Sequence, residues 1–490
     1  MPELSEFQRP IIDFVSDDES DQHAIASAYA GSGKTFILKE SAQAIDDDES
    51  MVICAFNVPI AEELTRRIRR ANTEIRTNHS LGLRTLKQVW GNDVKVSDGA
   101  DYLNHVLINA LPQRVTDDVK SDVRALVEKC MAFVADDDPN QAFVRVTDLM
   151  YRFECQPKDR NMPPEQYVTW ALKTLELLRV PSKFICYSQM LYVPAFHRWS
   201  TGDFRWTLVD EMQDLNRAQM IVARNSMHEY GRFFGVGDRK QTINIWNGAD
   251  PGGMDKLKRV FRAREFKLPI SYRVSESVAE LVRGFIPDFR AREGAPRGLV
   301  AEVSEKFMRE NWKPGDMFLS RKNATLPRAC LMALSCGVPA YIRGGKDITK
   351  GLFDLIRRSR QTNILLFLKW LRKYEEQQAA LLLAAKQETK ADDLADTVAT
   401  LIELSDGCQT TAQLQERMTR LFIDEHPQGK LMCSTVHKAK GLEVATEDDT
   451  VWLDWSTFRS NSEEEENITY VAQTRAKGKL YMVRMEGNKK

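Results

Sequence analysis

The octapeptide at residues 28–35, Ala-Tyr-Ala-Gly-Ser-Gly-Lys-Thr, carries residue types that suit the binding of a phosphate chain. It follows a strand-like stretch and precedes a helix-like stretch, which is the context that a phosphate-binding loop requires. Gly31 and Gly33 permit backbone conformations in which N–H groups point at phosphate oxygens beside the helix N-terminus. Lys34 would reach the β- and γ-phosphates, and the Thr35 hydroxyl would hold Mg²⁺. We therefore predict a nucleoside triphosphate site at this loop.

Two adjacent carboxylates follow another strand-like stretch, at 206–209. At the end of such a strand Asp210 can hold Mg²⁺, and Glu211 beside it can orient and deprotonate an attacking water. By itself the segment 207–214, Thr-Leu-Val-Asp-Glu-Met-Gln-Asp, is also compatible with an acidic turn. Together with the phosphate loop, it predicts the hydrolysis of a nucleoside triphosphate.

Strand-like and helix-like stretches alternate around both motifs, which predicts an α/β fold with parallel sheets. The strand-like stretches are 24–29, 51–56, 206–209 and 232–236 in a first block, and 317–320, 431–434 and 450–453 in a second. Elsewhere the pattern changes to long amphipathic helices. The clearest of these are 119–134, 164–178, 363–376 and 391–404. The chain is thus predicted to hold two parallel-sheet domains, each with a mainly helical insertion.

Composition excludes several classes of protein. The 490 residues are 43% hydrophobic and 28% charged, as in an ordinary soluble globular protein. No apolar stretch approaches the roughly 20 residues that span a bilayer, and the N-terminus lacks the basic start and apolar core of a signal peptide. The eight cysteines occur without a CxxC pair, so neither a zinc ribbon nor a disulfide framework is expected. We expect an intracellular protein without a membrane partner.

The distribution of charge is less informative than the motifs. The net charge of −1 gives no sign of a nucleic-acid partner, although a binding groove needs only local positive charge. Acidic runs at 17–21, 46–49 and 136–138 are expected to lie on solvated loops. The densest basic cluster, at 66–70, fits a solvated helix face as well as a phosphate contact.

Taken together, the motifs resemble those of superfamily-one helicases of the UvrD/Rep/PcrA type, in the order in which that family has them. The matching segments are 7–9, 28–35, 55–64, 77–80, 207–214, 236–241, 271–273, 435–443 and 470–476. Ala28 stands where the general phosphate loop has glycine, and alanine is common there in this family. The resemblance covers essentially the whole chain and implies two RecA-like domains. The expected boundaries are 1–88 with 191–265 for the first domain, 89–190 for its helical insertion, 266–345 with 429–490 for the second domain, and 346–428 for a short helical insertion.

The resemblance implies that the nucleotide is ATP, and it assigns contacts to residues along the chain. Gln8 would read the adenine edge, Tyr272 would stack near the adenine, and Glu443 would lie near the ribose. Gln241 would sense the γ-phosphate. The loop residues that would surround the phosphates are Ala30, Gly31, Ser32, Gly33, Lys34 and Thr35, and the Mg²⁺ ligands would be Thr35 and Asp210. Gln8 and Tyr272 also fit a capping or core interpretation.

Two arginines of the second block would complete the ATP site according to the resemblance. Arg273 would contact the γ-phosphate, and Arg475 would act as an arginine finger. If both reach the γ-phosphate, ATP bridges two domains and hydrolysis removes the charge that holds them together. A cationic finger is worth about 10³–10⁵ in rate in related phosphoryl-transfer enzymes. We expect Arg475→Ala to abolish turnover and to leave the fold intact.

Single-stranded nucleic acid is gripped by aromatic stacking and backbone contacts, without readout of sequence. The ring-bearing candidates for such a track are Phe56, His79, Trp246 and His437, and their polar partners are Asn57, Thr77, Arg321 and Asn323. The rings also fit a packed core, and the histidines also fit a purely hydrogen-bonding role. Asn244 and Asn247 stand where many relatives carry a stacking aromatic and an arginine, which places the grip on one base in doubt.

The resemblance implies an ATP-dependent DNA helicase or translocase that moves 3′→5′ on single-stranded DNA and unwinds duplex at single-strand/duplex junctions. One alternative is a poorly processive translocase that strips proteins from DNA. Another is an ATP-gated subunit that recruits a nuclease or replisome partner through residues 346–428. The short second insertion indicates a trimmed motor, and the expected location is the cytoplasm of a bacterial or phage-infected cell.

Overall fold

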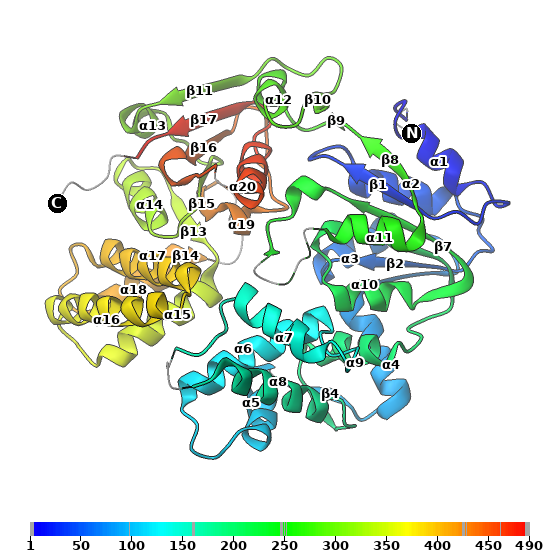
Figure 1. Ribbon diagram of the computed structural model, residues 1–490. Coiled ribbons are helices and arrows are strands. Elements are labelled where there is room, and N and C mark those ends of the chain that lie inside the picture. Colours follow the sequence, from blue (N-terminus) through cyan, green and yellow to red (C-terminus); the bar gives the residue numbers. More distant parts are fainter. Residues whose placement is uncertain are drawn as a thin grey trace. The chain divides into compact units, whose positions relative to one another are not determined.

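The computed structural model describes residues 4–97, 99–158, 162–245, 248, 250, 252–423, 427, 429–460 and 462–485. Contacts divide the chain into two compact units, Met1–Pro269 and Ile270–Lys490. Figure 1 shows that each unit holds one large sheet with helices packed on it and a separate group of helices. The α/β fold with two parallel-sheet domains and helical insertions is confirmed.

The sheet of the first unit has six strands in the order β3-β2-β6-β7-β1-β8, and every pair is parallel. Its strands are β1 Ala24–Ala28, β2 Met51–Ala55, β3 Thr73–Thr77, β6 Phe204–Val209, β7 Met227–Gly237 and β8 Arg264–Leu268. Parallel strands that are covered on both faces are apolar throughout, as β2 is. Because β8 pairs with β1, the first unit extends a few residues past the predicted boundary at 265.

Helices cover both faces of this sheet. One face packs against α1 Arg9–Val15, α2 Lys34–Ala44 and α3 Val58–Arg67, around buried side chains such as Ile37 and Phe234. A second core lies under α4 Asn78–Trp90, α10 Arg217–Arg224 and α11 Gly253–Phe261. Each phosphate-site motif leaves the sheet at the carboxyl end of its strand, which is where ligands bind in open α/β sheets.

The first helical insertion continues the second of these cores. It consists of α5 Gly99–Ala110, α6 Asp117–Phe133, α7 Ala142–Arg152 and α8 Pro164–Leu178, and α9 Gln189–His197 leads back to the sheet. A short pair of strands, β4 Lys95–Val96 and β5 Phe184–Ile185, closes its base. The predicted helices at 119–134 and 164–178 are confirmed as α6 and α8.

The second unit has a seven-stranded parallel sheet in the order β11-β17-β16-β12-β15-β13-β14. Its strands are β11 Leu299–Val303, β12 Met317–Ser320, β13 Ala340–Arg343, β14 Phe422–Ile423, β15 Leu431–Thr435, β16 Thr450–Asp454 and β17 Lys479–Val483. A separate small pair joins β9 Ile270–Ser271 to β10 Arg290–Ala291. The packed helices are α12 Glu276–Arg283, α13 Glu305–Asn311, α14 Thr325–Ser335, α19 Val436–Ala439 and α20 Glu463–Gln473.

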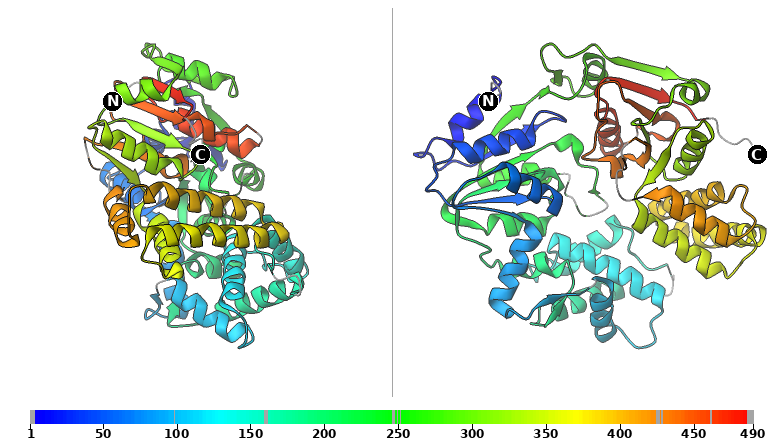
Figure 2. Two further views of the ribbon diagram at one scale, coloured as in Figure 1. Left: turned by 90° about the vertical axis from the view of Figure 1, so that its left-hand side faces the viewer. Right: turned by 180° about the vertical axis from the view of Figure 1, so that it is seen from behind.

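The second helical insertion shares its core with this sheet. It contains α15 Gly345–Ser359, α16 Ile364–Ala384, α17 Glu388–Ser405 and α18 Thr411–Leu421, which stack side by side in Figure 2. Buried Phe367 and Leu401 belong to the same apolar cluster as Phe318 and Cys433 of the strands. The strand β14, which pairs with β13, also falls within the predicted insertion 346–428.

One expectation about charge is wrong. The acidic runs near 17–21 and 46–49 are largely exposed, as predicted, but Asp136 and the side chain of Asp137 are buried. Arginines from neighbouring helices surround these two carboxylates and compensate their charge. The sequence alone predicts that such an acidic run is exposed to solvent, because the arginines that pair with it lie far away along the chain.

Candidate functional site

The phosphate loop has the geometry that its sequence predicts. Strand β1 ends at Ala28 and helix α2 begins at Lys34, so the loop turns at the carboxyl edge of the sheet. Gly31 and Gly33 have φ angles of 73° and 87°, in the left-handed region that favours glycine. Two residues of the loop, Ala30 and Ser32, are buried. The N-terminal N–H groups of α2 are therefore positioned for an anion.

Lys34 and Glu211 form an ion pair at the centre of this site. Lys34 Nζ lies 2.5 Å from Glu211 Oε2. Burial disfavours the charged lysine, but Glu211, Asp238 and Asp210 outweigh this effect and raise its pKa above the usual value. Glu211 has a φ of 47°, a conformation that is uncommon for a residue other than glycine and that occurs at functional sites. Lys34 thus stays cationic, as a phosphate ligand must.

Asp210 is a buried carboxylate that repels its neighbour. The Glu211 N–H donates to Asp210 Oδ1 at 2.9 Å. Burial, followed by the charge of Glu211, raises the pKa of Asp210 to about 7. A divalent cation would relieve this repulsion, so the donor set fits Mg²⁺. No group of three His, Cys, Asp or Glu side chains suited to a metal occurs in the described part of the chain. The ion would therefore rely on Asp210, the Thr35 hydroxyl, phosphate oxygens and water.

Gln213 is a residue of this site that sequence reasoning missed. Its Nε2 donates to Glu211 Oε2 at 2.6 Å, and its Oε1 accepts from the Asp238 N–H at 2.9 Å. A Cβ on Gly237 would lie 2.6 Å from Gln213 Oε1, so only glycine allows this approach. Gln213 thus connects Glu211, just after β6, with Asp238, which begins the segment that leads to the buried Gln241. The sequence pointed to Gln213 only through its position inside the acidic motif 207–214.

Gln8 lies against the phosphate loop, as expected of a residue that contacts the nucleotide. A Cβ on Gly33 would be 3.5 Å from Gln8 Nε2, and the Ser5 N–H donates to Gln8 Oε1 at 3.1 Å. Buried Arg232 holds the helix that follows Gln8, because its guanidinium donates to the Phe14 carbonyl at 3.0 Å. The adenine contact itself stays a prediction.

In the second unit Glu443 pairs with two cations. It forms ion pairs with Arg273 and, at 3.2 Å, with Lys477. Burial alone would raise the pKa of Glu443, but Arg273 and Lys477 bring it below the usual value. The structure thus brings Arg273 and Glu443 together, with Tyr272 exposed beside them. The ribose contact expected for Glu443 stays a prediction.

Arg475 is buried within the second unit. It is 1% exposed, and it donates to the carbonyls of Val471 at 2.8 Å and Leu442 at 2.7 Å. Arg475→Ala would leave these buried carbonyl groups without their donor, so we now expect the variant to fold with lower stability instead of leaving the fold unaffected. A role in turnover stays a prediction.

Four of the predicted strand-binding residues meet in one cleft of the first unit. The cleft has a volume of about 510 Å³, and its lining includes Phe56, Asn57, Thr77 and His79. Its remaining lining includes Lys129, Met131 and Ala132 of α6, together with Tyr187, Asp214, Asn216 and Asn244. Aromatic and polar groups, one lysine and two carboxylates, Glu128 and Asp214, therefore face the same space, and the aromatic and polar groups suit single-stranded nucleic acid.

His79 and Tyr187 form a stacked pair at this cleft. Their ring centroids are 4.0 Å apart at an interplanar angle of 23°. Burial lowers the pKa of His79 to about 4, so the imidazole is neutral at pH 7 and offers a π-face without positive charge. Tyr187 is exposed. Sequence reasoning missed it, since its only signal was an aromatic residue shortly before the strand pattern resumes.

Asn57 and Thr77 have a second role as helix caps. Asn57 Oδ1 accepts from the Ile60 N–H at 3.0 Å and begins α3, while Thr77 Oγ1 accepts from the Ser80 N–H at 3.2 Å and begins α4. Both residues are N-caps of their helices, and both also line the cleft. Contact with a strand stays a prediction for each.

Comparison with known proteins decides the family. A model described as the UvrD/REP helicase N-terminal domain matches residues 15–262, and one described as the UvrD-like helicase C-terminal domain matches residues 318–487. The chain belongs to the UvrD/Rep helicase family. Together the two matches cover the phosphate loop, the acidic segment 207–214 and the motifs at 236–241, 435–443 and 470–476, whereas the segments 7–9 and 271–273 lie outside them.

The chain is similar to several bacterial members of the family. A probable DNA helicase II homolog of Rickettsia felis is 24% identical over 306 residues, which are 57% of this chain and 45% of the relative. The ATP-dependent DNA helicase Rep of Buchnera aphidicola is 24% identical over 282 residues, 53% of this chain and 42% of the relative. A Mycoplasma pneumoniae helicase II homolog is 26% identical over 184 residues, 37% and 24% of the two chains. This chain spans under half the length of each relative.

Three other residues predicted to contact single-stranded nucleic acid lie in the second unit, and two of them contact carboxylates there. Arg321 Nε lies 3.1 Å from Glu465 Oε1 of α20. Asn323 donates through its N–H and its Nδ2 to Asp396 Oδ2 of α17, at 2.8 and 3.1 Å. His437 lies in the short helix α19. These contacts give Arg321 and Asn323 a structural role, and their contact with a strand stays a prediction.

Trp246, one of the four ring-bearing candidates, and the neighbouring Asn247 lie outside the described residues. Asn244 is described, and its Nδ2 donates to Asp214 Oδ1 at 3.4 Å. Of the helices that the structure describes, none has the length and apolar character to cross a membrane.

Proposed function

We propose that this chain is an ATP-driven motor that moves 3′→5′ along single-stranded DNA and unwinds duplex at single-strand/duplex junctions, in the cytoplasm of a bacterial or phage-infected cell. Lys34 would bind the β- and γ-phosphates, Asp210 and Thr35 would hold Mg²⁺, and Glu211 would deprotonate the attacking water. Gln241 would sense the γ-phosphate. The direction of movement is supported by the family resemblance alone.

The observation that carries the proposal is a chain of contacts between the nucleotide site and the cleft. Glu211 Oε2 contacts both Lys34 Nζ and Gln213 Nε2. The same Nε2 lies 3.3 Å from Asp214 Oδ2, and Asp214 lines the cleft. The proposed general base is thus separated from the cleft by a single amide side chain. A strand in the cleft and a nucleotide on the loop would then influence each other through contiguous groups.

Two cations of the second unit would complete the site. Arg273 and Arg475 would stabilise the charge on the transferred phosphoryl group, as a finger does in related enzymes. Arg273 pairs with Glu443 through Nε, so its terminal guanidinium nitrogens would make the contact with the phosphate.

The test is the ATPase activity of the unchanged chain with Mg²⁺, measured with and without an oligothymidylate strand. We expect the strand to raise turnover and a blunt duplex of the same length to have a much smaller effect, because the cleft is lined for exposed bases. If neither nucleic acid changes turnover, the motor proposal fails.

One observation favours a second candidate, an ATP-gated subunit that recruits another protein. Helix α16 exposes the apolar side chains of Leu365, Leu366, Leu381 and Leu383. The same ATPase measurement separates the candidates, since a recruiting subunit has no need of strand-stimulated turnover. Deletion of residues 346–428 is not a clean test, because Phe367 and Leu401 belong to the core of the second unit.

A further inference from the structure

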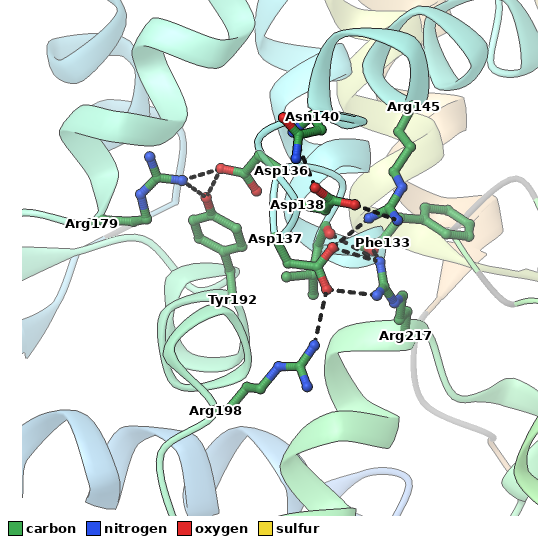
Figure 3. A network of polar contacts seen from close by, with 11 residues as sticks. Phe133, Asp136, Asp137, Asp138, Asn140, Arg145, Arg179, Tyr192, Arg198 and Arg217 are labelled. Carbon is green, nitrogen blue, oxygen red and sulfur yellow. Dashed lines mark hydrogen bonds and ion pairs between the residues drawn. The ribbon is translucent and has the colours of Figure 1, made fainter. Parts of the chain in front are cut away.

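The loop that follows α6 carries a carboxylate that binds three arginines. Asp137 accepts from Arg145 at 2.5 Å and from Arg217 at 2.6 Å, and Arg198 lies 3.9 Å away. Its side chain is only 6% exposed. Figure 3 shows the carboxylate between the arginines, which come from α7, from the end of α9 and from α10. No residue of this cluster belongs to the nucleotide site described above.

Arg217 fastens two helices together. It is the first residue of α10, and its Nη1 donates to the carbonyls of Phe133 and Val134, each at 3.1 Å. These carbonyls end α6, where the helix dipole attracts a cation. Its Nη2 binds Asp137 at the same time. One guanidinium therefore joins the end of α6, the loop beyond it and the start of α10.

The two fastened helices both line the cleft. Helix α6 contributes Glu128, Lys129, Met131 and Ala132, and α10 contributes Ala218 and Gln219. The residue before α10, Asn216, also lines the cleft and follows the acidic motif by two positions. A shift of α6 relative to α10 would thus change both the width of the cleft and the position of Asp214.

We propose that Asp137 is a positioning residue: through Arg217 it holds the α6 wall of the cleft against the acidic motif, so that a bound strand is coupled to Glu211. The inference rests on the proposed strand-stimulated ATPase. Without the negative charge of Asp137, Arg217 would bind only the α6 carbonyls, and the loop would no longer be fixed. Strand binding would then act on α6 without displacing Asp214.

The chain provides a matched control in the adjacent residue. Asp136 is also buried, and it accepts from Tyr192 Oη at 2.6 Å and pairs with Arg179. In the part of the chain that the structure describes, its partners come from α8 and α9 and none from α10. Asp136→Asn therefore removes a buried charge from the same loop and leaves Arg217 in place. A purely structural role predicts the same behaviour for both variants.

The experiment compares Asp137→Asn, Asp137→Glu and Asp136→Asn with the unchanged chain. Melting temperature, strand-free turnover, KM for ATP and maximal turnover with saturating oligothymidylate are measured for each. We expect Asp137→Asn to lower strand stimulation about tenfold, with strand-free turnover and KM within about twofold. Asp136→Asn should lower the melting temperature as much but keep the stimulation, and Asp137→Glu should restore part of it. If Asp137→Asn does not fold, Arg217→Lys replaces it with the same expectation.

The double variant Asp137→Asn with Arg217→Met supplies an independent readout. If the two residues act as a unit, the double variant loses no more stimulation than the worse single variant. Additive losses overturn the inference, as does equal stimulation in Asp137→Asn and Asp136→Asn. An unchanged chain that no strand stimulates overturns the proposed function and the inference with it, whereas a stimulated chain with matching variants overturns the inference alone.

Discussion

Glu211→Gln is expected to lower strand-stimulated ATP turnover about 10²- to 10⁴-fold, the usual contribution of a general base. The amide keeps the size of the side chain and an oxygen acceptor for Lys34, which lies 2.5 Å from Glu211 Oε2. It removes the basic carboxylate that would deprotonate water. ATP binding should therefore persist, and we expect the affinity for a non-hydrolysable ATP analogue to stay within a few-fold of the unchanged chain.

Comparison of Glu211→Gln with Lys34→Ala distinguishes a loss of chemistry from a loss of ATP binding in the same assay. This variant removes the cation that would hold the phosphates, so both turnover and affinity for the analogue should fall. Glu229→Gln, at an exposed position of β7 outside the matching motifs, serves as the control for loss of a carboxylate, and it should change neither quantity. Unchanged turnover in Glu211→Gln would contradict the assignment of Glu211 as the base.

Arg475→Ala is expected to have the second-largest effect, a loss of about 10³-fold or more in turnover. Because the guanidinium donates to the Val471 and Leu442 carbonyls, the same change should also lower the free energy of unfolding of the second unit by about 2–4 kcal/mol. The two effects must be separated by measuring turnover well below the melting temperature, where the variant is folded.

Arg273→Ala provides this separation more cleanly. Its side chain is 19% exposed and pairs with Glu443, which keeps Lys477 as a second cation, so the loss should cost less stability than the loss of Arg475. A similar loss of turnover without a large change in melting temperature would support a finger role for this pair of arginines. If Arg273→Ala and Arg475→Ala reduce turnover only in proportion to the unfolded fraction, the proposed role of both residues is refuted.

Short motifs that dictate both backbone and chemistry could be predicted from the sequence. The phosphate loop needs Gly31 and Gly33 for its left-handed turns, and it lies between strand and helix as expected. Asp210 and Glu211 follow a buried strand, so their position at the sheet edge follows from the local pattern. The helical insertions were visible as changes of hydrophobic period.

Contacts between residues that are distant in the chain could not be predicted in this way. The pairing of Asp137 with Arg217 spans 80 positions, and an acidic run gives no sign of the arginines that bury it. Likewise the stacking of His79 on Tyr187 depends on the return of the chain after the whole first insertion. The sequence also gave no reason to expect Arg475 to be buried, because its motif describes chemistry rather than packing.

The most direct test of the proposed motor is strand displacement from duplexes that carry a 3′ or a 5′ single-stranded tail, with ATP and Mg²⁺. We predict displacement from the 3′-tailed duplex, none from the 5′-tailed duplex, and none when ATP is omitted or Glu211→Gln replaces the unchanged chain. ATP hydrolysis on both substrates without displacement would instead favour a translocase that strips proteins from DNA. Displacement only from the 5′ tail would contradict the proposed direction, and failure to hydrolyse ATP on any tailed substrate would contradict the motor itself.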